Sequence, residues 1–161
     1  MRDIETQVLS QSHMETWFQK RLAPDFPRFQ KGVIGRMRPR LLCCDYEAKE
    51  SIMAYDVLDW ELNLLGHMQN GIIATGFDTC MGMLCHYYAT PNLLTTVTLS
   101  ATYLQPVPKQ KTLQYQTKIK SFGKSLVTLE SVAYIAEEKK QIATATATFK
   151  ILHQKKKGDT I

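Results

Sequence analysis

The sequence lacks the features that assign a protein to several specialised classes. None of its apolar runs approaches the ~20 residues that a membrane-spanning helix needs. The first residues lack the basic and apolar regions of a secretory signal peptide, so we expect a cytoplasmic protein with no membrane partner. The 161 residues contain no internal repeat and fit one domain, which can bury a core without disulfides or metals.

Cysteine is scarce, and its four copies suit neither a disulfide nor a metal site. Cys43 and Cys44 are neighbours, which point to opposite faces of a strand, while Cys80 and Cys85 lie well apart around a helix. No C-x-x-C spacing occurs, and the four histidines are scattered along the chain. We therefore expect no bound metal.

The formal net charge of +5 comes from lysines near the C-terminus and in the second half of the chain. No nucleic-acid-binding motif accompanies them, and they are not interleaved with aromatic residues, so we expect no nucleic-acid partner. A solvated tail and strand edges explain these lysines, although they would also attract an anionic cofactor such as a nucleotide carrier.

The first third of the chain predicts one helix and a hairpin. Residues 3–22 have the apolar spacing of an amphipathic helix, with Asp3 as its N-cap and an end before Pro24. Two extended segments, 35–46 and 51–59, flank a charged turn at 47–50. We assign the helix and its connector to residues 1–32, the core to 33–152 and a basic tail to 153–161.

A long apolar helix is predicted over residues 71–88, because apolar side chains recur there at intervals of three and four until Pro91. Its other positions are mostly small, so we expect it to be buried nearly all round. A two-residue hairpin turn at Asn70-Gly71 is the alternative. Asp78 is the carboxylate of this helix, and its burial is costly unless it has a structural hydrogen-bond partner or a chemical role.

From residue 95 onward, polar and apolar residues alternate in four stretches separated by turn residues: 95–103, 113–120, 127–135 and 143–151. This alternation predicts an antiparallel sheet with one covered face. Alanines on the last stretch leave room for the long helix to lie close to the sheet. The predicted class is α+β, with about six strands around a central helix and a second helix at the N-terminus.

This order of elements resembles the hotdog fold, and the local residues resemble the phenylacetyl-CoA thioesterase-like (PaaI-like) branch of its thioesterase superfamily. Members carry an Asn, a Gly, a His-Gly-Gly turn that opens the central helix, and an Asp seven residues later. Their positions match Asn63, Gly66, Gly71 and Asp78 without a gap. Further matching elements are Thr96-Val-Thr-Leu99, Tyr103-Leu-Gln-Pro106 and Gly123-Lys-Ser125, and the resemblance covers residues 35–151.

The chain departs from the family pattern at the turn, where Gln69-Asn70-Gly71 replaces His-Gly-Gly. Glutamine still hydrogen-bonds and asparagine tolerates a positive φ, so the turn can form, but histidine chemistry is lost. His67 lies two positions early and is no substitute. A smaller departure is Lys109-Gln-Lys111, where the family often has Gly followed by an acidic residue.

The resemblance implies an acyl-CoA thioesterase with no cofactor beyond the coenzyme A of its substrate. Asp78 would be the general base or nucleophile, and the backbone N–H of Asn70, with that of Gly71, the oxyanion donor beside Gln69. Eight residues of helix rise roughly 12 Å, so one helix cannot bring both groups to one thioester. The family implies a homodimer whose sites lie between subunits, and dimers that can pair into tetramers.

The resemblance also assigns supporting roles. Asn63 would hold the carbonyl, Thr96 would position water, and Lys124 with Ser125 would meet the phosphates of coenzyme A. An adaptable acyl pocket could come from Met53, Met68, Met81 and Met83. Each role has an ordinary alternative: a loop-capping asparagine, a strand threonine, a hydrogen-bonded helix aspartate, a solvated lysine and core methionines.

Three functions therefore compete. The first is thioester hydrolysis, and the second is a non-catalytic acyl-binding protein on the same fold, made credible by the altered turn. The third, hydratase or dehydratase chemistry, needs a histidine at the entrance of the central helix, where none is in register. The sequence does not identify the acyl group.

Overall fold

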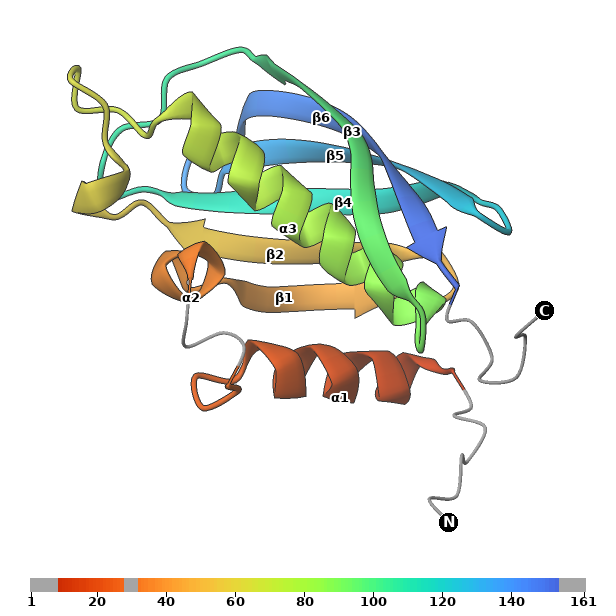
Figure 1. The fold of residues 1–161 in the computed structure, drawn as a ribbon. Helices are drawn as coiled ribbons and strands as arrows, with labels where there is room; N and C mark the ends of the chain where they lie inside the picture. Colours follow the sequence, from red (N-terminus) through yellow and green to blue (C-terminus); the bar gives the residue numbers. More distant parts are fainter. Residues whose placement is uncertain (1–8, 28–31, 154–161) are drawn as a thin grey trace.

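The structure is a computed structural model that describes residues 9–27 and 32–153. Figure 1 shows one curved sheet with a long helix against its inner face and a second helix beside one edge. The helical elements are α1 (Gln11–Leu22), α2 (Val33–Met37), a 3₁₀ turn η1 (Asp59–Glu61) and α3 (Asn70–Ala89). The strands are β1 (Arg40–Asp45), β2 (Glu50–Asp56), β3 (Leu93–Tyr103), β4 (Thr112–Phe122), β5 (Leu126–Ile135) and β6 (Lys140–Leu152).

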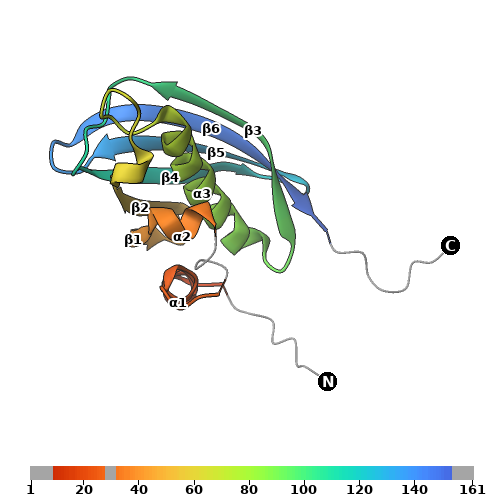
Figure 2. The ribbon, with the colours of Figure 1, turned by 60° about the vertical axis from the view of Figure 1, so that its left-hand side comes forward.

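The six strands form one antiparallel sheet in the order β1-β2-β4-β5-β6-β3. Figure 2 shows that the sheet curls around α3, which confirms the predicted α+β architecture. The helical interpretation of Asn70-Gly71 is also confirmed, because α3 begins at Asn70. Strands β1 and β3 are the two edges.

The inner face of the sheet forms the core, as the alternation predicts. Ala143, Ala145 and Ala147 of β6 are buried, and their small side chains let α3 approach the backbone. Gly82 of α3 faces the ring of Phe149, at a distance where a Cβ atom would meet the ring at 3.5 Å. Met53, Met68 and Met81 are also core residues, which favours the ordinary interpretation of these three methionines.

The prediction that α3 is covered nearly all round is wrong for one stripe of the helix. Gly71 is exposed, and Ala74, Thr75, Asp78, Gly82 and His86 are only half-buried. These positions recur at three- and four-residue spacing, so they lie along one side of the helix. The sheet covers the opposite side and leaves this stripe open.

The N-terminal predictions need three corrections. Helix α1 begins at Gln11 because Ser10 is its N-cap, with Ser10 Oγ accepting from the N–H of His13 at 3.3 Å; Asp3 lies outside the described residues. The predicted first strand, 35–46, begins only at Arg40, because residues 35–37 belong to α2 and Arg38 ends α2 in a left-handed conformation with φ 53°. The second segment leaves the sheet at Asp56 and turns into η1. The hairpin between β1 and β2 is confirmed.

Helix α1 covers the β1 edge of the sheet. The side chain of Gln11 donates to the carbonyl of Cys44 at 2.8 Å and accepts from the N–H of Tyr46 at 2.8 Å. Trp17 packs edge-on against Tyr87 near the end of α3. In the part of the chain that the structure describes, no helix has both the length and the hydropathy needed to span a bilayer.

Tyr115 of β4 fixes the beginning of α3, and this contact gives a test of the packing. Its hydroxyl donates to the carbonyl of Ile73 at 3.2 Å, and a Cβ at Gly76 would overlap this hydroxyl. We expect Gly76→Ala to lower the free energy of unfolding by about 1–3 kcal/mol, because overpacking outweighs the better helix propensity of alanine. Urea unfolding measures this change.

Gly82→Ala is the matched control, since its added methyl makes an ordinary contact with Phe149. We expect it to leave the free energy of unfolding unchanged or to raise it by up to about 1 kcal/mol. Equal stability of the two variants would contradict the proposed packing of Tyr115 against α3.

Candidate functional site

Asp78 lies in a groove of about 310 Å³ along the open stripe of α3. Thr96 of β3 donates a hydrogen bond from its Oγ1 to Asp78 Oδ1 at 2.8 Å. The lining is mostly apolar and comes from α2, α3, β3 and β6. Its residues are Ile34, Asp78, Thr79, Gly82, Met83, His86, Leu93, Leu94, Thr96 and Phe149. The structure therefore brings two of the predicted site residues together.

A β-bulge makes this pair possible. Thr96 is paired with Phe149, and the register then shifts before Thr98, which is paired with Thr148. The extra residue, Val97, puts Thr96 on the same face as Leu99, although simple alternation would put Thr96 on the outer face with Thr98. The bulge turns the Thr96 hydroxyl toward α3.

Asp78 is half-buried rather than enclosed, which corrects the expectation of a deeply buried carboxylate. Its Oδ1 accepts from Thr96, and among the described residues Oδ2 has no hydrogen-bond partner. The carboxylate therefore keeps one oxygen free toward the groove. Of the four candidate pocket methionines, Met83 lines this groove.

The beginning of α3 offers free backbone donors. Gln69, Asn70 and Gly71 are exposed, and the carbonyl of Gln69 accepts from the N–H groups of Ile72 (2.9 Å) and Ile73 (3.1 Å). Within residues 9–27 and 32–153, the N–H groups of Asn70 and Gly71 have no acceptor. Asn70 adopts a helical conformation without a positive φ, so the replacement of glycine here costs no backbone strain.

Asn63 closes the loop that precedes α3. Its Oδ1 accepts from the N–H of Leu65 (2.9 Å) and of His67 (3.2 Å), and its own N–H donates to the carbonyl of His67 (2.7 Å). Gly66 completes the turn with φ 76°. The side-chain oxygen thus has a structural partner, while the structure gives its amide nitrogen no partner among the described residues.

Lys124 and Ser125 lie in the exposed turn between β4 and β5. The carbonyl of Ser125 accepts from the N–H of Ile151 at 2.8 Å, which ties the turn to the end of β6. Since Leu152 of β6 is paired with Leu93 of β3, this turn is at the same end of the sheet as the apolar part of the groove. Neither residue lines the groove itself.

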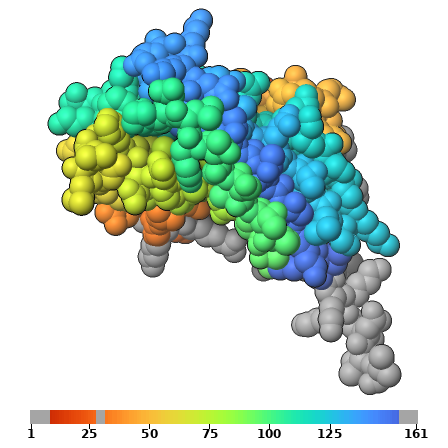
Figure 3. All heavy atoms as spheres, turned by 90° about the horizontal axis from the view of Figure 1, so that it is seen from above, coloured from red at the N-terminus to blue at the C-terminus, as the bar shows by residue number. Residues whose placement is uncertain are grey.

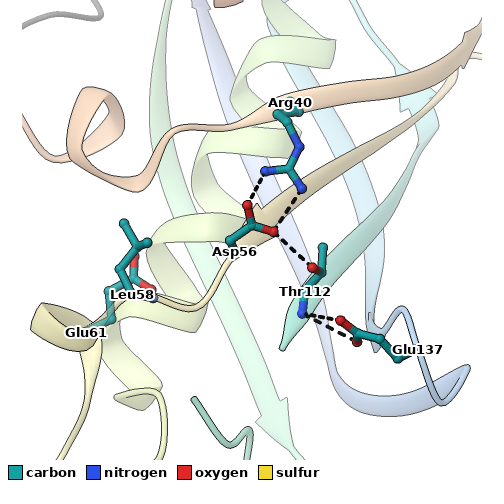
Figure 4. Close-up of polar contacts among 6 residues, drawn as sticks. All are labelled: Arg40, Asp56, Leu58, Glu61, Thr112 and Glu137. Atoms are coloured by element: carbon teal, nitrogen blue, oxygen red, sulfur yellow. Dashed lines mark hydrogen bonds and ion pairs between the residues drawn. The ribbon is translucent and has the colours of Figure 1, made fainter. Parts of the chain in front are cut away.

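Glu61 is a buried acid that the sequence did not reveal, because Asp59-Trp-Glu61 looks like an ordinary polar turn. It is 1% exposed, and desolvation by burial raises the pKa of its carboxyl. One oxygen accepts from the N–H of Leu58 at 2.9 Å. Figure 4 draws Leu58 and Glu61 close together. Its backbone carbonyl accepts from the N–H of Gln69 at 2.7 Å, so Glu61 helps to fix the approach to α3.

A second polar cluster, also drawn in Figure 4, lies away from the groove. Arg40 holds Asp56 through two hydrogen bonds, and Thr112 donates to the same carboxylate at 2.9 Å. The hydrogen bonds from Arg40 lower the pKa of Asp56. These bonds connect β1, β2 and β4 beside a larger cavity of about 650 Å³, which none of the predicted site residues line.

No group of three histidine, cysteine, aspartate or glutamate side chains in the described part of the chain is placed to hold a metal ion. The chain matches the sequence model of the thioesterase superfamily over residues 65–142, from the loop before α3 to the beginning of β6. This part of the chain is similar to the thioesterase superfamily. A search of curated proteins gives no significant match.

Solved structures share the fold of this chain. The PaaI protein of the Escherichia coli phenylacetic acid degradation operon has a TM-score of 0.72, with 14% identity over 89% of this chain and 97% of its own. A phenylacetic acid degradation-related protein from Ralstonia eutropha has 24% identity over 83% and 98%, with a TM-score of 0.67. A hypothetical thioesterase from Streptococcus pneumoniae, solved with coenzyme A, has 17% identity over 73% and 91%, with a TM-score of 0.65.

The loop role of Asn63 gives a stability test. We expect Asn63→Ala to lower the free energy of unfolding by about 1–2 kcal/mol, because two backbone N–H groups lose their acceptor. Asn63→Asp keeps that acceptor and should lose less than half as much stability. Urea unfolding of both variants checks this, and an alanine variant as stable as the unchanged chain would show that the loop does not need these bonds.

Proposed function

We propose that the protein is an acyl-CoA thioesterase whose active sites lie between two protomers. The observation that carries this proposal is the Asp78–Thr96 pair, which lies in an open groove on a thioesterase-superfamily fold and has one carboxylate oxygen free. The oxyanion donors at Asn70 and Gly71 lie two helical turns away, roughly 12 Å along α3. A complete site therefore needs the donors of a second copy.

The two edges of the sheet favour one mode of pairing. Gln11 of α1 caps the β1 edge, whereas β3 is paired with β6 on one side only. Eleven residues of β3 are left as an open edge, with exposed apolar side chains at Leu93, Val97 and Tyr103. Open edges of this length favour pairing with another strand, and a homodimer joined at β3 satisfies them.

The direction of β3 supports a site shared across this pairing. Its first residues, Leu93 and Leu94, line the groove, while the chain just beyond its end contacts the approach to α3: the N–H of Met68 donates to the carbonyl of Val107 at 2.8 Å. Figure 3 shows the residues around the beginning of α3 (yellow) beside β3 (green) on one side of the molecule. Antiparallel pairing of two β3 edges then brings the beginning of each α3 toward the groove of the other protomer.

In this arrangement the thioester oxygen accepts hydrogen bonds from the N–H groups of Asn70 and Gly71, where the helix dipole adds positive potential. Asp78 of the second protomer removes a proton from a water molecule that Thr96 helps to orient, and the water oxygen attacks the carbonyl carbon. The tetrahedral intermediate collapses with cleavage of the C–S bond. Asp78 returns the proton to the departing thiolate, which leaves a free acid and coenzyme A.

Coenzyme A is the expected carrier of the acyl group. The turn with Lys124 and Ser125 offers a cation and a hydroxyl to its phosphates, at the end of the sheet where the groove opens. The structural neighbour from Streptococcus pneumoniae contains coenzyme A, which supports the same ligand here. The amide nitrogen of Asn63 is a further donor toward the carbonyl, and Gln69 is exposed at the beginning of α3.

A non-catalytic acyl-CoA-binding protein is the second candidate, because Gln69-Asn70 replaces the His-Gly of the PaaI-like pattern. The two candidates share the groove and the dimer and differ in turnover. Release of free thiol from a panel of short, long and aromatic acyl-CoAs therefore separates them. Saturable binding without thiol release would favour the binding protein.

We expect Asp78→Asn to lower kcat by at least about 100-fold, the size of effect that loss of a general base produces. The asparagine keeps an acceptor for Thr96, so the fold and acyl-CoA binding should persist. Asp25→Asn, which alters an exposed carboxylate outside the groove, is the matched control and should keep full activity. Undiminished turnover by Asp78→Asn would disprove the assignment.

A further inference from the structure

Two adjacent leucines are the most exposed large apolar side chains of the described chain. Leu64 is 106% exposed and Leu65 is 82% exposed, whereas Leu93 and Val97 at the β3 edge reach 54%. Both leucines lie in residues 63–67, here called the leucine loop, which ends two residues before α3. Two adjacent, highly exposed leucines are costly in a protein that remains a monomer, and they indicate a surface that another molecule covers.

The leucine loop is held in a defined shape. The side chain of Asn63 bonds two N–H groups within the loop, and the N–H of Gly66 donates to the carbonyl of Asn63 at 3.0 Å. Two single antiparallel β-bridges hold the loop at its ends, one between Leu62 and Met68 and one between His67 and Pro108. Since the loop is ordered within the protomer, docking of its leucines would cost little further conformational entropy.

We infer that the leucine loop of each protomer docks into the Asp78 groove of a second copy and forms an apolar wall of its acyl pocket. This inference rests on the dimer of the proposed function. The groove offers Ile34, Met83 and Leu94 to such a loop, and Leu93 is at its open end. The bridge between His67 and Pro108 keeps the loop beside the end of β3, and antiparallel β3 pairing brings that end to the beginning of the partner strand.

The docked leucines define the class of substrate. They would exclude water from the side of the groove that is open in one protomer, beside the free oxygen of Asp78. A pocket walled by leucine, methionine and isoleucine favours an uncharged, apolar acyl group and disfavours a dicarboxylic one, whose second carboxylate would lie in apolar surroundings near Asp78. The substrate class is therefore an acyl-CoA with an apolar acyl chain.

The first test is the double variant Leu64→Ser/Leu65→Ser. We expect its dimer dissociation constant, measured by sedimentation, to rise at least about 100-fold, which corresponds to about 2.8 kcal/mol. Leu42→Ser, which alters an exposed leucine on the opposite edge strand β1, is the matched control and should change this constant less than threefold. An unchanged dissociation constant in the double variant would overturn the inference.

The second test is cross-linking that does not depend on turnover. In a Cys43→Ser background the remaining thiols react slowly, because burial raises the pKa of Cys44 to about 11 and those of Cys80 and Cys85 to about 12. An equal mixture of Leu65→Cys and Leu93→Cys proteins should form a covalent dimer on mild oxidation, and neither protein alone should do so. A dimer that is active but not cross-linked overturns the inference and leaves the proposed function intact.

Two further outcomes are distinguishable. A cross-linked dimer without thiol release supports the docking and counts against the hydrolase. Insertion of the leucines into a lipid surface is the other explanation of their exposure, and flotation with vesicles of phosphatidylcholine and phosphatidylglycerol tests it. If the double serine variant loses vesicle binding while its dimer is unchanged, the leucine loop is a membrane contact and the inference is wrong.

Discussion

The close approach of α3 to the inner face of the sheet determines the rest of the structure. Small side chains permit it: the alanines of β6 form a shallow surface, and Gly76 accommodates the hydroxyl of Tyr115. Because α3 lies this close, Asp78 is within hydrogen-bond distance of Thr96 on β3. The hydrogen bond from the Tyr115 hydroxyl to the carbonyl of Ile73 holds the first turn of α3 in place. The free N–H groups of Asn70 and Gly71 therefore have a fixed direction.

This packing also leaves the protomer incomplete along one side. The sheet covers one side of α3, and α1 caps the β1 edge through Gln11, but the described elements leave a groove along the stripe of α3 and do not pair the β3 edge. A carboxylate, an open edge strand and two solvated leucines all lie along this side. A single pairing at β3 would cover all three, which is a more economical explanation than a separate partner for each.

Periodicity was sufficient to predict the helix, the four long strands and the face on which they meet, because each of those elements buries a regular stripe. The irregular features were not predictable. The bulge at Val97 turns Thr96 toward Asp78 against the alternation of its own strand, and only pairing with β6 reveals it. Glu61 is buried by residues that are distant in the sequence. The N-cap of α1 is Ser10 rather than the predicted Asp3, because the side chain of Ser10 accepts from the N–H of His13. Asp78, Asn63 and the α3 turn were found by resemblance and spacing rather than by periodicity.

Replacement of His-Gly by Gln69-Asn70 at the beginning of α3 alters two side chains but leaves the backbone donors in place. An oxyanion is bound by backbone N–H groups, and these remain at Asn70 and Gly71 whatever side chain precedes them. Asn70 keeps a helical conformation, so the loss of glycine does not rotate its N–H away. What the chain gives up is the imidazole at position 69, where glutamine can hydrogen-bond but cannot carry a proton. Proton transfer would then depend on Asp78 alone, which makes its free oxygen the feature that separates a hydrolase from a binding protein on this fold.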